Sequence, residues 1–212
     1  NDTLYLYNYE FNKLKKIPIN ELSSLAYLSP YISDNDEKSY QDYMIGFRLE
    51  QNISFDNSKY SNTFACFGTE NPFVENQMVR IEWEKISPKD LPNQLRNINT
   101  QSQSYIYKFK FNNKTYFLQD LIGEDEIKER ILTILDKKNN IIFTKKFIKG
   151  EGAEFQNVNP KNGESDYQWT GNLLRNQPSV IFGFLSESFG CESITFIKEN
   201  FSTLYINCDN RH

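Results

Sequence analysis

A two-residue alternation of aromatic and β-branched residues recurs along the chain, and it constrains the fold more than any other feature. The clearest case is residues 105–111, Tyr-Ile-Tyr-Lys-Phe-Lys-Phe, followed by Asn112-Asn113 and then by residues 115–119. This period is typical of a strand, and Asn tolerates the positive φ of a tight turn. The sequence therefore predicts a hairpin here. The other alternating segments are residues 3–11, 43–50, 63–67 and 78–86.

Only a few segments favour helix over strand. Residues 127–147 fit both periods, and we favour a hairpin that turns through residues 136–140. A short helix can open at residues 123–126 just before it. The competing helix candidate is residues 19–28, with Asn20 as the N-cap and Pro30 beyond its end.

These segments predict an antiparallel β sandwich or barrel-like β fold with one or two short helices, and a mixed α+β arrangement is the alternative. A chain of 212 residues can bury a core, and its 17 Phe and 13 Tyr supply the apolar area. We expect a single β-rich domain. Two lobes, residues 1–91 and 105–212, are compatible with it, because residues 92–104 are rich in Asn, Gln and Ser and read as a polar linker.

Charge and hydropathy narrow the classes of partner. The 28 acidic and 24 basic residues are spread along the whole chain, which argues against nucleic acid because phosphate binding needs clustered cations. The densest basic spots, residues 13–16 and Lys145-Lys146, read as ordinary solvated faces. No apolar run reaches the length of about 18 residues that a membrane span needs, so we expect a soluble protein.

The cysteines point to an oxidising compartment. Cys191 and Cys208 lie in two short segments that can run side by side, and a bridge between them would stabilise the fold by about 3 kcal/mol. Two unrelated reduced thiols are the alternative. Cys66 reads as a free core thiol. The expected localisation is periplasmic or secreted, and a chain that starts at Asn1 fits a mature exported product as well as a trimmed one.

Catalytic and metal-binding signatures are absent from the sequence. The sole histidine, His212, is the last residue, which is a poor place for a catalytic imidazole. Phosphate loops, nucleophile elbows, zinc spacings and the calcium-loop spacing do not occur, so no cofactor and no metal are expected. Paired carboxylates remain, which makes glycoside hydrolase the least unlikely enzyme class. The carboxylates concerned are Glu151, Glu154, Glu164 and Asp166, near Tyr167 and Trp169.

Two aromatic groupings are candidate binding surfaces. Tyr5, Tyr7 and Tyr9 share one face of the first strand, where they either contact a partner or pack under a loop. Trp169 and Arg175 bracket the end of the acidic loop; both types are common in interfaces, although Trp169 can instead cover the core. We therefore predict a non-enzymatic exported protein that binds a protein partner and inhibits it, as immunity proteins do. The alternative is a carbohydrate-binding or carbohydrate-cleaving module that uses residues 151–169.

Overall fold

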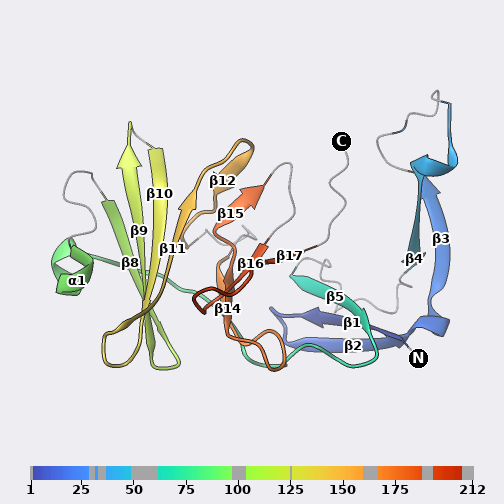
Figure 1. The fold of residues 1–212 in the computed structure, drawn as a ribbon, viewed down its shortest axis with the longest axis horizontal. Coiled ribbons are helices and arrows are strands. Elements are labelled where there is room, and N and C mark those ends of the chain that lie inside the picture. The colour runs from blue at the N-terminus through green and yellow to red at the C-terminus, as the bar shows by residue number, and fades with distance from the viewer. Residues whose placement is uncertain are drawn as a thin grey trace. The chain divides into compact units, whose positions relative to one another are not determined.

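The computed structural model describes residues 2–28, 32, 37–48, 62–96, 104–124, 126–159, 167–187 and 193–206. The chain is mainly β, with several antiparallel sheets and few, short helices, as the sequence predicts; the fold is β-sandwich-like (Figure 1). The strands are β1 (Thr3–Asn8), β2 (Lys13–Pro18), β3 (Ser23–Leu28), β4 (Tyr43–Arg48), β5 (Thr63–Gly68), β6 (Met78–Arg80), β7 (Glu84–Ile86), β8 (Ser104–Phe111), β9 (Lys114–Gly123), β10 (Glu126–Leu135), β11 (Ile141–Ile148), β12 (Ala153–Phe155), β13 (Trp169–Gly171), β14 (Val180–Phe182), β15 (Leu185–Glu187), β16 (Ser193–Phe196) and β17 (Leu204–Tyr205). The helices are α1 (Asn93–Arg96) and the single 3₁₀ turns η1 (Ile19–Glu21), η2 (Tyr40–Asp42) and η4 (Pro88–Asp90).

The chain divides into two compact units. The N-terminal unit comprises Asn1–Met78, Asn172–Gln177 and Asp209–His212, and the C-terminal unit comprises Val79–Gly171 and Pro178–Cys208. The division at Met78 precedes the predicted linker at residues 92–104, whose first residues, 92–96, lie in the C-terminal unit and include α1.

A five-stranded meander, in the order β11-β10-β9-β8-β7, forms one layer of the C-terminal unit. Asn112 and Asn113 adopt φ angles of 46° and 59° in the β8–β9 turn, so the predicted hairpin is confirmed. The second predicted hairpin, which turns through residues 136–140, is confirmed as well. There the Asp136 carboxylate accepts hydrogen bonds from the amides of Lys138 and Asn140, both at 2.8 Å, which fixes the loop between β10 and β11.

A second antiparallel sheet, in the order β17-β16-β14-β13-β6, packs on the meander. Its Ile181 joins Leu118 and Leu132 of the meander in one buried cluster. The opposite face of the meander is covered near α1, where Leu95 packs with Phe117. The central strand β9 is therefore buried on both faces.

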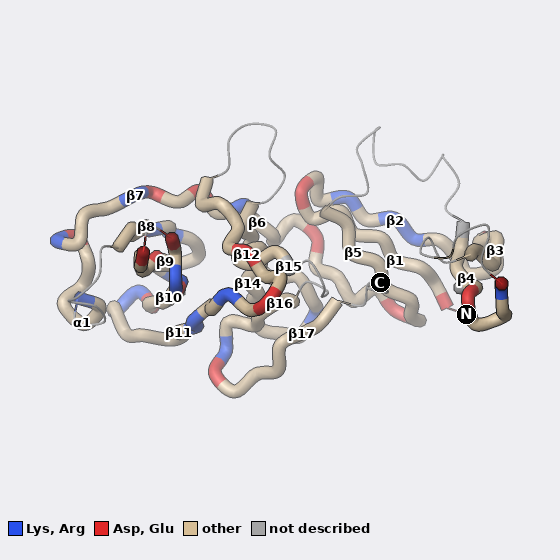
Figure 2. The backbone as a smooth tube through the Cα atoms, turned by 90° about the horizontal axis from the view of Figure 1, so that it is seen from above, with Lys and Arg blue, Asp and Glu red and all other residues tan. Residues whose placement is uncertain are grey.

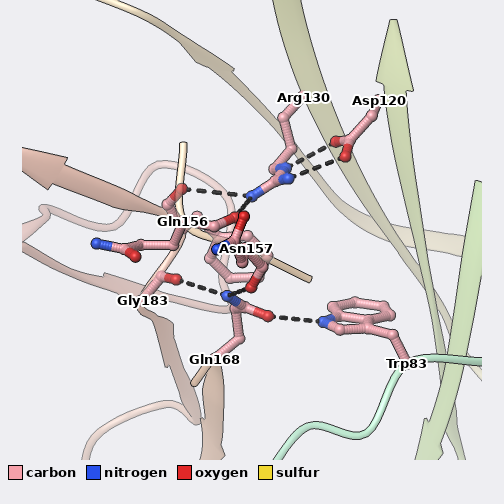
Figure 3. Close-up of polar contacts among 8 residues, drawn as sticks. Trp83, Asp120, Arg130, Gln156, Asn157, Gln168 and Gly183 are labelled. Atoms are coloured by element: carbon pink, nitrogen blue, oxygen red, sulfur yellow. Dashed lines mark hydrogen bonds and ion pairs between the residues drawn. The ribbon is translucent and has the colours of Figure 1, made fainter. Parts of the chain in front are cut away.

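A polar network crosses the space between these layers (Figure 3). The Arg130 guanidinium on β10 donates to both carboxylate oxygens of Asp120 on β9, at 2.7 and 2.9 Å, and donates to the carbonyl of Gln156 at 2.7 Å. Both charged side chains are 1% exposed. Beside them, the Gln168 amide accepts from the Trp83 indole at 3.1 Å and donates to the Gly183 carbonyl at 2.9 Å. These buried polar groups satisfy one another, which specifies how the layers stack.

The N-terminal unit holds a three-stranded sheet, β2-β1-β5, and a separate hairpin, β3–β4. The helix predicted at residues 19–28 was wrong. Only η1 forms, its C-cap Leu22 is extended, and Ser23–Leu28 pairs with β4 over six residues. An isolated helix of ten residues is only marginally stable in water. The hydrogen bonds and packing of the β3–β4 pair therefore stabilise this segment more than a helix would.

The short helix predicted at residues 123–126 was also wrong. Gly123 ends β9, Glu126 begins β10, and these two residues are cross-strand partners. Glu124 has a φ of 50°, which suits a tight turn and not a helix.

No helix in the described parts of the chain combines the length and apolar character required to cross a membrane.

Candidate functional site

The three tyrosines predicted as a contact face are buried in the N-terminal unit. Tyr5, Tyr7 and Tyr9 are 6%, 0% and 8% exposed. The Tyr7 ring stacks on Phe73 at 5.5 Å, and burial raises the pKa of its hydroxyl. The Tyr9 hydroxyl donates to the Asn62 side chain at 2.9 Å. These rings are therefore packed inside the unit, which is the alternative that the sequence left open.

The predicted acidic and aromatic loop is described in part, and its tryptophan is buried. Trp169 is 5% exposed within β13, so its face is not available for stacking on a sugar. Tyr167 is half-buried, with the Arg80 guanidinium 4.4 Å from its ring centre. Glu151 is exposed, and Glu154 pairs with Lys149 at 2.8 Å. Glu164 and Asp166 lie outside the described residues.

Arg175 belongs to the N-terminal unit, whereas the residues of the acidic loop belong to the C-terminal unit. Its side chain is exposed, and its Nε donates to the Phe73 carbonyl at 3.3 Å. Arg175 and Tyr7 therefore both contact Phe73.

The predicted bridge between Cys191 and Cys208 falls outside the described residues, as does His212, so the bridge stays a prediction. Cys66 has a free, half-buried thiol on β5. In the segments that the structure describes, no group of three or more His, Cys, Asp or Glu side chains is arranged to hold a metal ion.

The hairpin β3–β4 carries an apolar surface that the sequence reasoning missed. Tyr43, Ile45 and Phe47 on β4 are 46%, 83% and 37% exposed. Because side chains alternate along a strand, these three point to one face. Their cross-strand partners on β3 are Leu28, Ala26 and Ser24, most of them too small to cover their neighbours. We call this six-residue surface the aromatic face.

The aromatic face continues onto the three-stranded sheet. The Phe47 ring lies 5.3 Å from the ring of Phe67 on β5, and Phe67 is itself 48% exposed. The alternation in residues 43–50 correctly indicated a strand. It could not indicate that the opposing strand offers Ser24 and Ala26, because the register of a hairpin depends on a loop whose conformation is not readable from sequence.

A second feature lies in the C-terminal unit, on the edge strand β11. Lys145 shares its face of β11 with the buried rings of Phe143 and Phe147. Its ammonium donates to the Thr195 hydroxyl at 2.6 Å, and burial lowers its pKa. Two cavities, of about 210 and about 300 Å³, are each lined by both Lys145 and Thr195. The interpretation of Lys145 as an ordinary solvated lysine was therefore wrong.

Comparison with known proteins identifies no relative. No protein-family model, no curated protein and no solved structure matches the chain.

Proposed function

We propose that the protein is a non-enzymatic exported binding protein whose partner is another protein, and that the partner docks on the aromatic face. The single observation that carries the proposal is the exposure of Tyr43, Ile45 and Phe47 along one face of the hairpin β3–β4. Tyr and Phe are enriched in protein interfaces, and contiguous exposed apolar surface marks interaction sites.

The stability of the hairpin also favours a partner. A two-stranded hairpin is marginal in water unless a third strand or another layer packs on it. Among the described residues, β3 and β4 pair only with each other. A protein that covers Ile45 and its neighbours would add a layer on this face of the hairpin.

The aromatic face is chemically uniform. Its six residues are Tyr43, Ile45, Phe47, Ser24, Ala26 and Leu28, and none carries a charge. A complementary partner surface is therefore apolar at its centre, because a charge buried against this face would lose its hydration without gaining a counter-ion.

Inhibition of the partner, in the manner of a periplasmic immunity protein, is the form of binding that we favour. The net charge of −4 and the 13 Tyr residues support a surface that binds protein, and a partner with a basic rim would be attracted to it over distance.

Capture from an extract of exported proteins, followed by mass spectrometry, tests the proposal with a matched pair of variants. Ile45→Asp places a charge on the aromatic face, whereas Ile141→Asp places one on β11, where Ile141 is 46% exposed. We expect the wild type and Ile141→Asp to recover the same partner and Ile45→Asp to lose it, with all three proteins equally folded by circular dichroism. Recovery of that partner by Ile45→Asp at wild-type yield, or repeated capture of no protein by the wild type, overturns the proposal.

A further inference from the structure

The lysines at the end of β11 have different neighbours. Lys146 pairs with Glu129 at 2.9 Å, and Lys149 pairs with Glu126 and Glu154 at 3.1 and 2.8 Å. Lys145 lies on the opposite face of the strand from Lys146. Its ammonium donates a hydrogen bond to the Thr195 hydroxyl and lies 5.3 Å from the centre of the Phe147 ring. In the described parts of the chain, no carboxylate lies within ion-pair distance of Lys145.

Among the described residues, one hydrogen-bond acceptor is found for the Lys145 ammonium. An ammonium has three N–H donors, and the Thr195 hydroxyl satisfies one of them. Thr195 is 7% exposed and Phe147 is 8% exposed, so the half-buried Lys145 side chain has buried groups on one side. An unpaired cation is costly in such a place, and an anion beside it would lower that cost.

The space next to the ammonium suits a small molecule with an apolar part. The cavity of about 210 Å³ holds the volume of about seven water molecules, at roughly 30 Å³ each. Its lining combines the polar Lys145, Ser193 and Thr195 with the apolar Phe147 and Leu185. A ligand site combines apolar walls with a small number of polar groups, and this lining offers both.

We propose that this cavity binds a small organic carboxylate, whose carboxylate group accepts hydrogen bonds from Lys145 and the Ser193 hydroxyl and whose apolar body lies against Phe147 and Leu185. All of these residues belong to the C-terminal unit, whereas the aromatic face belongs to the N-terminal unit, so the two proposals rest on different residues. The lowered pKa of Lys145 is consistent with an ammonium that lacks its anion.

The position of Lys145 on the inner face of β11 has a second explanation. Charged side chains that point inward on edge strands discourage one sheet from pairing with another, and β11 is the edge of its sheet. That role requires a charge and no ligand. The two explanations differ in whether an anion binds saturably at Lys145.

Titration of the whole chain with sodium benzoate distinguishes the two explanations for Lys145. Binding is followed by amide chemical shifts or by calorimetry. Benzyl alcohol has nearly the same shape without the charge, and inorganic phosphate has the charge without the apolar body. We expect saturable binding of benzoate in the range of about 1 mM, and weaker binding of both other probes.

Two lysine variants locate the site. Lys145→Met keeps the apolar stem and removes the charge, and Lys149→Met makes the same change at a lysine that lines neither cavity. Loss of a charged hydrogen bond corresponds to a tenfold or greater loss in affinity, so we expect Lys145→Met to weaken benzoate binding by about tenfold or more. Lys149→Met should stay within about twofold of the wild type, because the Lys149 ammonium lies outside the cavity and is paired with Glu126 and Glu154.

Three results overturn the proposal: no saturable binding of benzoate by the wild type, equal binding by Lys145→Met, or phosphate binding more tightly than benzoate. If Lys145→Met fails to fold, Thr195→Val provides the second test, since the ammonium loses its fixed position while the charge remains. Benzoate binding by Thr195→Val at wild-type affinity also counts against the proposed geometry. Failure of any of these tests leaves the proposed protein interface unaffected.

Discussion

The hairpins β3–β4 and β9–β10 arise from similar sequence patterns and end in opposite environments. Both contain strands rich in Tyr, Phe and Ile. In β9 six consecutive residues, Tyr116–Leu121, are buried, because one layer packs on each face of its sheet. In β4 the residues of the aromatic face are exposed. The comparison shows that alternating aromatic and aliphatic residues determine that a strand forms. Whether the side chains of that strand are buried depends on which other elements pack on its sheet.

The largest expected effect comes from breaking the ion pair that ties β9 to β10. Arg130→Met leaves the Asp120 carboxylate, 1% exposed, without its cation, and we expect the free energy of unfolding to fall by about 3–5 kcal/mol. Urea unfolding followed by circular dichroism measures this loss.

The matched control is the double variant Arg130→Met with Asp120→Leu. It removes both charges, so it should recover much of the lost stability, because an apolar pair of similar volume leaves no buried charge behind. A double variant as unstable as the single one would mean that loss of the hydrogen bond from Arg130 to the Gln156 carbonyl, and not the unpaired Asp120 carboxylate, lowers the stability.

A pair of isoleucines tests the comparison directly. Ile134 on β10 is 0% exposed and Ile45 on β4 is 83% exposed. Ile134→Ala should lower the free energy of unfolding by about 2–5 kcal/mol, because it removes buried methyl groups and leaves a cavity. Ile45→Ala should change it by less than about 0.5 kcal/mol. A cost of more than about 1 kcal/mol at Ile45 would show that the aromatic face is covered in the free protein.

One glycine next to β14, in the layer that covers β9, adopts a backbone conformation that other residues rarely take. Gly183 has a φ of 86°, and a Cβ atom there would lie 2.5 Å from the Tyr167 carbonyl oxygen. Gly183→Ala should therefore cost about 1–3 kcal/mol through backbone strain and the clash with a backbone atom. Gly150→Ala is the control, because no atom lies within 4 Å of the corresponding Cβ position. Equal effects of the two substitutions on thermal unfolding would contradict this account.

Two hairpins of the meander could be predicted from the sequence, because each depends on residues that are neighbours along the chain. Alternation and the turn preference of Asn located the β8–β9 hairpin, and the polar residues 136–140 located the β10–β11 hairpin. The helix predicted at residues 19–28 failed because the pairing of β3 with β4 outweighs helical spacing.

The candidate sites were less accessible to sequence reasoning, because they depend on residues distant along the chain. The tyrosines of β1 are buried since Asn62 and Phe73 pack beside them. Lys145 resembles Lys146 in the sequence, and only the position of Thr195, fifty residues away, distinguishes them. Similarly, the exposure of Ile45 follows from the small side chain of Ala26 opposite, which requires the register of the hairpin.

The smallest expected effect concerns the turn that made the β8–β9 hairpin predictable. Asn113 has a φ of 59°, a left-handed conformation that costs an ordinary residue about 1–2 kcal/mol and costs Gly almost nothing. Asn113→Ala should lower the free energy of unfolding by about 1 kcal/mol, and Asn113→Gly should leave it nearly unchanged. Urea unfolding of the two variants decides between backbone conformation and side-chain contact as the reason for Asn at this position. If both variants lose the same amount, the Asn113 side chain is what stabilises the turn, and the hairpin was predicted correctly for an incomplete reason.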